Sequence, residues 1–324
     1  MTEIHCTNHV DRKDRPAEIR AFVRDNPAAS NCEIGRRFGV SEAAIRKHRK
    51  RAGNPEHQRL FSIPSPQTSA SRELSVASIL PEAEAVTGDR QVDAMLWLAR
   101  VCKTATDLAT LGKAVEAAKR IKADPEKLRD RYQQWLIKQG AGAFQTVFAT
   151  MSLGDIDAKA EAARERIATN AEGIAIFGSF ETAMEPTEAE RMILETAGPM
   201  PPGYGYEWPA EAFAGIFARS VNPWTLSDVL AERAYFDWLY KTRKAMFATA
   251  NPDDYMGDDD APIEARRYWM MSLLTTIEPV DDAERTVVAQ AAVAKGFSDF
   301  SKDTIAVLAH LCGAKVREGS SDFD

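Results

Sequence analysis

The sequence predicts an all-α protein in which a small N-terminal module of three helices is joined by a flexible Pro/Ser-rich linker to a larger multi-helix body. Apolar residues recur at three- and four-residue spacing in residues 17–51 and again from residue 90 onward, which is the period of an amphipathic helix. Between these regions the composition changes to proline and serine. The chain has 324 residues, enough for about two domains, and its 44% content of hydrophobic residues can form a sizeable core.

The first two helices of the module are expected at residues 17–25 and 33–38. The first ends at an Asn-Pro pair, since a proline disfavours the helical conformation of the residue that precedes it. In the second, Ile34 and Phe38 lie four residues apart and share one face of the helix. Gly39 follows at the position where a left-handed residue ends many helices. The spacing therefore predicts a tight turn at this glycine.

The third helix follows this turn and is expected to carry a face suited to reading DNA. Ser41 is a favourable N-cap, because its hydroxyl can accept a backbone N–H from the first turn. Val40, Ile45 and His48 are expected to face inward, and we interpret His48 as a packing residue rather than a phosphate contact or a pH sensor. Short side chains allow the start of a helix to approach base edges in the major groove, and Arg or Lys behind them reach guanine edges and phosphates. The predicted DNA contacts are Ser41, Glu42, Ala43, Arg46, Lys47 and Lys50, the flanking Arg49 and Arg51, and Arg36 and Arg37 on the second helix.

Residues 33–47 carry the pattern E-I-x-x-x-F-G-V-S-x-x-x-I-x-x. This pattern resembles the helix-turn-helix of phage terminase small subunits and of related mobile-element and regulator DNA-binding domains. The resemblance covers about 45 residues and implies sequence-specific binding to duplex DNA by a protein of phage or prophage origin. One departure is His48 at the last inward position, where family members usually carry an aliphatic or aromatic residue.

The distribution of charge agrees with a DNA-binding module at the N-terminus. Residues 11–60 contain thirteen Arg or Lys against seven Asp or Glu, a surplus of six positive charges in a chain of net charge −7. The rest of the chain therefore carries a net charge of −13 and should repel DNA. We expect double-stranded DNA to be bound by the module alone.

The expected domain boundaries follow from the same patterns. The helix-turn-helix domain should cover residues 11–53 and the Pro/Ser-rich linker residues 54–89. The body should have a first half at 90–197 and a second half at 210–318, separated by a Pro/Gly-rich loop at 198–209. Aromatic residues in the second half are interpreted as core rather than as a base-stacking surface, since the local charge is not basic.

Several classes of protein are disfavoured by what the sequence lacks. It has no run of the ~18 apolar residues that a membrane span requires, and its first residues have no hydrophobic stretch typical of a secretory signal. Its four cysteines lie apart without a C-x-x-C pair, which indicates reduced thiols. We therefore expect a cytoplasmic protein, in the host cell if it is encoded by a phage, with no membrane partner.

The sequence contains only weak signals for catalytic or metal-binding residues. Five aspartates in residues 253–260 could hold Mg²⁺, but a run of this kind between two prolines is typical of a solvated loop. Four residues could be arranged as zinc ligands, although their spacing matches no standard finger: His5, Cys6, His9 and Cys32. No Walker loop, G-x-S-x-G or H-E-x-x-H motif is present. We expect no catalytic residue, no cofactor and no bound metal.

Three functions of different class remain open. The first is a terminase small subunit-like genome-packaging adaptor, in which the helical body forms a homo-oligomer and recruits a motor or assembly protein. The second is a helix-turn-helix transcription regulator whose body is a dimerisation or effector domain. The third is a metal-dependent enzyme of mobile DNA, which would require metal binding by residues 253–260.

Overall fold

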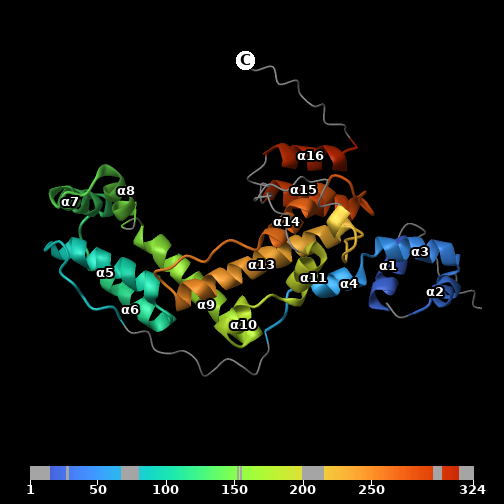
Figure 1. Cartoon of the computed structure of the whole chain (residues 1–324), viewed down its shortest axis with the longest axis horizontal. Helices are drawn as coiled ribbons and strands as arrows, with labels where there is room; N and C mark the ends of the chain where they lie inside the picture. Colours follow the sequence, from blue (N-terminus) through green and yellow to red (C-terminus); the bar gives the residue numbers. More distant parts are fainter. Residues whose placement is uncertain are drawn as a thin grey trace, which may run out of the picture. The chain divides into compact units, whose positions relative to one another are not determined.

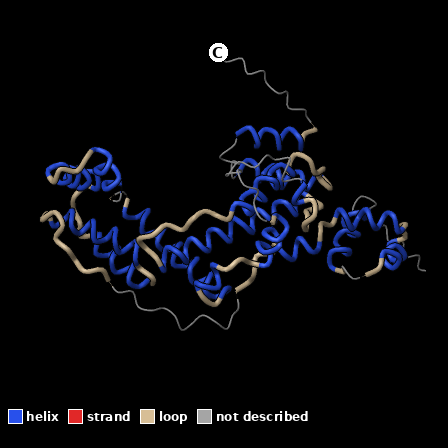
Figure 2. The backbone as a smooth tube through the Cα atoms, viewed as in Figure 1, coloured by secondary structure: helices blue, strands red, loops and turns tan. Residues whose placement is uncertain are grey.

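The computed structural model describes residues 15–26, 29–66, 80–151, 153, 155–198, 215–294 and 301–313. Within these residues the chain consists of helices joined by turns and loops, and no strand occurs in them (Figure 2). The prediction of an all-α protein is confirmed. Most of the predicted Pro/Gly-rich loop, at residues 199–209, lies outside the described residues, and so do residues 67–79 of the predicted linker.

The chain divides into two compact units (Figure 1). Unit 1 is formed by residues 1–63, 186–237 and 259–324, and unit 2 by residues 64–185 and 238–258. The units therefore interleave along the chain, unlike the consecutive halves expected from the sequence. The long helix α13 (Leu226–Ala250) contributes its first part to unit 1 and its second part to unit 2.

Unit 1 begins with three helices that we call the N-terminal cluster: α1 (Arg15–Asp25), α2 (Asn31–Phe38) and α3 (Glu42–Arg51). They enclose a small core of four buried aliphatic residues, Ile19, Val23, Ile34 and Ile45. At its edge the rings of Phe22 and Phe38 meet edge to face, with centroids 5.4 Å apart. The apolar residues at helical spacing in the sequence thus form the contact between these helices.

The rest of unit 1 is formed by helices from three separate stretches of the chain. They are α4 (Pro55–Leu60), α11 (Glu188–Ala197), the first part of α13, α14 (Ala261–Leu273), α15 (Asp282–Ala294) and α16 (Ser301–Leu311). Tyr235, Phe236 and Trp269 are buried in this part of unit 1, which agrees with their interpretation as core residues.

The linker was predicted to start at residue 54, but the structure has helix α4 at Pro55–Leu60. Asn54 caps α4 by accepting the backbone N–H groups of residues 56 and 57, and Pro55 occupies the favourable first position of the helix. His57, Leu60 and Phe61 are buried at 0%, 8% and 2% exposure. The prediction of a linker is therefore wrong for this stretch, because a local helix signal and buried side chains override the Pro/Ser composition.

Unit 2 contains α5 (Arg90–Thr104), α6 (Leu108–Ala118), α7 (Pro125–Lys138), α8 (Ala143–Met151), α9 (Ile156–Phe177), α10 (Phe180–Met184) and the second part of α13. Helices α5, α6 and α9 contact one another around an apolar core that includes Leu98, Leu111 and Ile167. None of the helices in the described part of the chain combines the length and the apolar content that crossing a membrane requires.

Candidate nucleic-acid interface

The connection between α2 and α3 is a tight turn fixed by local hydrogen bonds. Gly39 has a left-handed backbone (φ 60°, ψ 39°), which glycine adopts without steric cost. The amide of Val40 then donates to the carbonyl oxygen of Gly35 at 3.0 Å. Ser41 caps α3 by accepting the backbone N–H of Ala44 at 3.2 Å. The predicted positions of the turn and of this cap are both confirmed.

Two residues that sequence reasoning missed also hold α2 in place. Gly35 is buried where α2 meets the turn, and a Cβ added there would lie 2.8 Å from the carbonyl oxygen of Val40. Only a residue without a side chain allows this approach. Arg15 of α1 donates a hydrogen bond to the carbonyl oxygen of Phe38, at the C-terminus of α2. A glycine inside a short helix was the available signal for the first residue, whereas the partner of Arg15 lies 23 residues away.

The side of α3 opposite the core is exposed along its whole length. Ile45 is fully buried, whereas seven of the predicted contacts are exposed: Ser41, Glu42, Ala43, Arg46, Lys47, Lys50 and Arg51. Arg36 and Arg37 on α2 are exposed as well. The structure therefore places the small side chains of Ser41 and Ala43, beside Glu42, at the start of an exposed helical face and cations farther along it. A face of this kind suits insertion into a major groove.

Three of the cations on this face are available to a ligand. Lys47, Lys50 and Arg51 form no ion pair within the described part of the chain. Arg46 lies 3.6 Å from the carboxylate of Glu42, one turn earlier on α3, and both side chains are exposed. An exposed pair of this kind is weak, so a phosphate or base edge can compete for the guanidinium.

Two predicted contacts are also engaged inside the N-terminal cluster. Arg49 is half-buried and donates to the carbonyl oxygen of Ala29 at 2.5 Å and to Oδ1 of Asn31 at 3.0 Å. The guanidinium of Arg37 lies 4.3 Å from the ring centroid of Phe22. Arg49, which was predicted as a DNA contact flanking the outward face, ties α3 to the start of α2.

His48 is half-buried against the cluster, as expected for a packing residue. Its Nδ1 is buried without a hydrogen-bond partner among the described residues. Burial lowers the pKa of His48, and the nearby charges of Arg20, Arg51 and Lys47 lower it further. The imidazole is thus favoured in its neutral form, which can pack on the inner side of α3 without adding to the positive charge of this helix.

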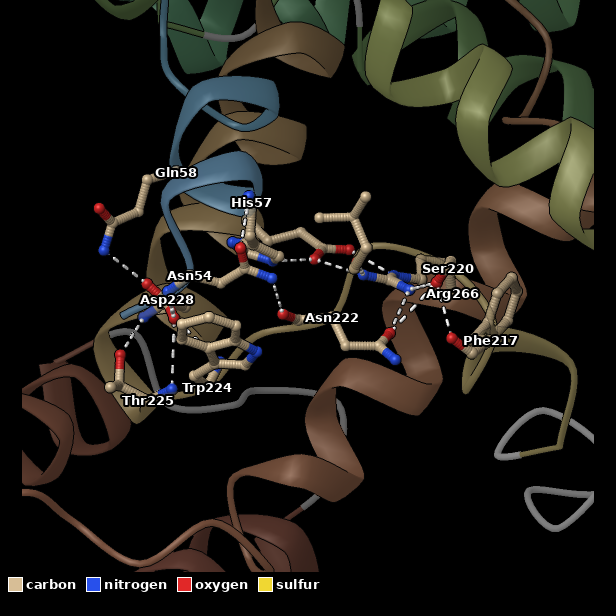
Figure 3. A network of polar contacts seen from close by, with 12 residues as sticks. Asn54, His57, Gln58, Phe217, Ser220, Asn222, Trp224, Thr225, Asp228 and Arg266 are labelled. Carbon is tan, nitrogen blue, oxygen red and sulfur yellow. Dashed lines mark hydrogen bonds and ion pairs between the residues drawn. The ribbon is translucent and has the colours of Figure 1, made fainter. Parts of the chain in front are cut away.

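Immediately after α3, helix α4 enters a buried polar network of unit 1 (Figure 3). Nε2 of His57 donates to the carboxylate of Glu232 at 2.6 Å, and the same carboxylate accepts Nε and Nη2 of Arg266 at 2.7 and 2.9 Å. All three side chains are at most 1% exposed. Burial alone would raise the pKa of Glu232, but the charge of Arg266 and the hydrogen bonds from Arg266 and His57 hold this pKa below its usual value.

A second set of polar contacts fixes the segment between α3 and α4 (Figure 3). Asp228 of α13 accepts the backbone N–H of Asn54 at 2.9 Å and Nε2 of Gln58 at 2.9 Å. Gly53 has φ +96°, and a Cβ there would lie 2.5 Å from Oδ1 of Asp228. In addition, Arg20 of α1 pairs with Asp281 at 2.5 Å. The N-terminal cluster is therefore attached to the rest of unit 1 by direct contacts.

The charged groups of the buried network and part of the acidic run at residues 253–260 are engaged in ion pairs. The side chains of His57, Glu232 and Arg266 are closed to solvent and hold helices together. In the acidic run, Asp253 pairs with Lys103 and Asp259 with Arg267. No group of three or more possible metal ligands exists among the described residues. Three of the candidate zinc ligands, His5, Cys6 and His9, lie outside those residues.

Comparison of the chain with protein-family models, with curated proteins and with solved structures finds no match.

Proposed function

We propose that this chain is a sequence-specific duplex DNA-binding protein whose α2 and α3 form a helix-turn-helix, with α3 as the recognition helix. The observation that carries the proposal is the exposed face of α3. Its start is small and polar, and Lys47, Lys50 and Arg51 follow without ion-pair partners in the described part of the chain. Short residues allow close approach to base edges, and unpaired cations bind guanine edges or phosphates.

The lead role is that of a terminase small subunit-like genome-packaging adaptor of a phage or prophage. In this role the N-terminal cluster binds a specific site on the genome. The acidic helical body forms the oligomer and recruits a motor or assembly protein. The resemblance of residues 33–47 to that family and the separation of basic and acidic regions support it.

A helix-turn-helix transcription regulator is the second candidate. One observation favours it: α4 and its N-cap Asn54 attach the N-terminal cluster to the rest of unit 1 through contacts with Glu232 and Asp228. A regulator that reads two half-sites as a dimer needs its recognition helices at a fixed separation, which such an attachment provides. Native mass spectrometry of the full chain separates the candidates, since a ring of many copies suits packaging and a dimer suits regulation.

The DNA-binding proposal is tested by selecting a binding site from random duplexes and measuring affinities by fluorescence anisotropy. Arg46→Ala and Lys47→Ala should each weaken binding to the selected site by about 1–3 kcal/mol, whereas Arg51→Ala should weaken binding to all sequences alike. A plot of the logarithm of the binding constant against the logarithm of the salt concentration has a negative slope. Loss of one phosphate contact should also make this slope less steep by about 0.9. The matched control is Lys127→Gln, which removes an exposed charge from α7 in unit 2. Equal effects of the control and of Lys47→Ala would refute the proposal.

A further inference from the structure

Unit 2 contains a pocket that the DNA-binding proposal does not use. It has a volume of about 790 Å³ and lies among residues of α5, α7 and α9, all within this unit. Pockets that hold small molecules in proteins have volumes of about 300–1,000 Å³. The size of the pocket is therefore suitable for a small organic ligand.

The wall of the pocket has a surplus of positive charge. Four basic side chains line it, Arg100, Lys103, Lys159 and Arg166, against the single carboxylate of Asp253. Arg100 also pairs with Glu84, outside the lining, at 3.4 Å, so the surplus comes chiefly from the two basic residues of α9. Lys103 pairs with Asp253 at 2.9 Å through side chains that are 54% and 90% exposed. An ion pair exposed to this extent contributes little free energy and can open for a ligand.

The two basic residues of α9 have no carboxylate partner in the described part of the chain. Lys159 forms no ion pair there. The guanidinium of Arg166 has only neutral acceptors, which are the carbonyl oxygens of Cys102 and Ala105 at 3.3 and 2.7 Å and Oγ1 of Thr249 at 3.0 Å. Burial lowers the pKa of Arg166. A partly desolvated cation without a counter-charge is costly, so an anion in the pocket would be stabilised there.

The remaining wall of the pocket is largely apolar. It is formed by Val86, Leu96 and Tyr132, together with Ala162 and Ala163 of α9. Tyr132 is partly buried and packs against the core of unit 2. Transfer of a ligand's apolar group from water to such a surface is favourable. A ligand that fits both parts of the wall joins an anionic group to an apolar one.

We propose that this pocket binds a small organic anion in which a carboxylate or phosphate is joined to an apolar group. The anionic group would lie between Lys159 and Arg166, and the apolar group against Leu96 and Tyr132. This binding site goes beyond DNA recognition and does not depend on it, because every residue used here belongs to unit 2.

The test measures binding of four probes to the full chain by isothermal titration calorimetry. Phenyl phosphate and phenylacetate carry both groups, inorganic phosphate carries only the charge, and benzyl alcohol carries only the ring. At least one of the two combined probes should bind more tightly than both single-group probes, and comparison of the two combined probes identifies the preferred anion. Absence of binding by both combined probes, or equally tight binding of inorganic phosphate, would overturn the proposal.

Variants then locate the binding site. Lys159→Gln should weaken binding of the preferred probe about tenfold, the effect of losing one charge-assisted contact. Lys127→Gln removes an exposed lysine of the same unit outside the pocket and should leave binding unchanged. Ala162→Phe fills the pocket from an exposed position on α9 and should abolish binding while circular dichroism stays the same. Full binding by a folded Ala162→Phe variant, or equal effects of the two lysine variants, would refute this location.

Discussion

The close approach of α2 to the turn makes Gly35→Ala a sensitive test of the geometry of the N-terminal cluster. In a helix with open space, replacing glycine by alanine stabilises a protein by about 0.5–1 kcal/mol, because the unfolded chain loses conformational freedom. At Gly35 the new Cβ would lie 2.8 Å from the carbonyl oxygen of Val40. This oxygen belongs to the backbone and cannot rotate away, so overpacking should cost about 1–3 kcal/mol. At the midpoints of these ranges the cost exceeds the gain, and we expect a net destabilisation of about 1 kcal/mol.

Gly112→Ala is the matched control, since Gly112 lies inside α6 and a Cβ there would meet no atom within 4 Å. This variant should be more stable than the wild type by up to about 1 kcal/mol. Hydrogen exchange of the amides in α3 and α6 resolves the two effects, because each reports local opening of its own helix. Increased protection of α3 in Gly35→Ala would show that α2 and the turn are not in the close contact described here.

Further predictions concern three side chains with unusual surroundings. Glu232→Gln should lower the free energy of unfolding by about 3–5 kcal/mol in urea titrations, because it leaves the buried charge of Arg266 uncompensated, whereas Glu188→Gln at an exposed pair should have little effect. Since the pKa of Glu232 is lowered, its contribution to stability is present above its unfolded-state value of 4.5 and should disappear as the pH falls through its folded-state pKa. The pKa of His48 is also lowered, so the wild type should lose stability as the pH falls below 6.5 and His48→Leu should lose less between pH 7.5 and 5.5. Arg49→Ala should increase hydrogen exchange at residues 29–31 even without DNA, and an effect seen only on DNA binding would contradict its internal role.

The features that the sequence predicted well are local. The cap at Ser41 and the turn at Gly39 are each set by neighbours within five residues, so their signals lie side by side in the sequence. The alternation of buried and exposed residues along α3 follows from the helical period alone. Arg49 shows the limit of this reasoning. It follows Ile45 by four residues and therefore lies toward the same side of the helix, but its charge suggested a DNA contact.

The features that could not be predicted depend on partners far away in the sequence. His57 meets Glu232 across 175 positions and Arg59 meets Glu188 across 129. A single sequence contains no signal for such pairs. Asn54 and Pro55 were not recognised as a helix start, because the surrounding prolines and serines indicated a linker. An isolated helix of six residues is not stable in water, so α4 depends on tertiary contacts such as the burial of Phe61.

The attachment of α4 changes what is expected of DNA recognition. A free tether after α3 predicts that two copies of the module tolerate varied spacing between their half-sites. In the structure, turning α3 relative to the rest of unit 1 would disturb the hydrogen bond from the amide of Asn54 to Asp228 and the ion pair between Arg20 and Asp281. Loss of a hydrogen bond to a charged group such as the carboxylate of Asp228 costs about 1.5–3 kcal/mol. For an oligomer that reads two half-sites, we therefore expect binding to weaken at least tenfold when five base pairs, about half a helical turn, are inserted between them. Gel-shift titrations with a spacing series measure this dependence, and equal affinity at every spacing would mean that α3 moves independently of α4.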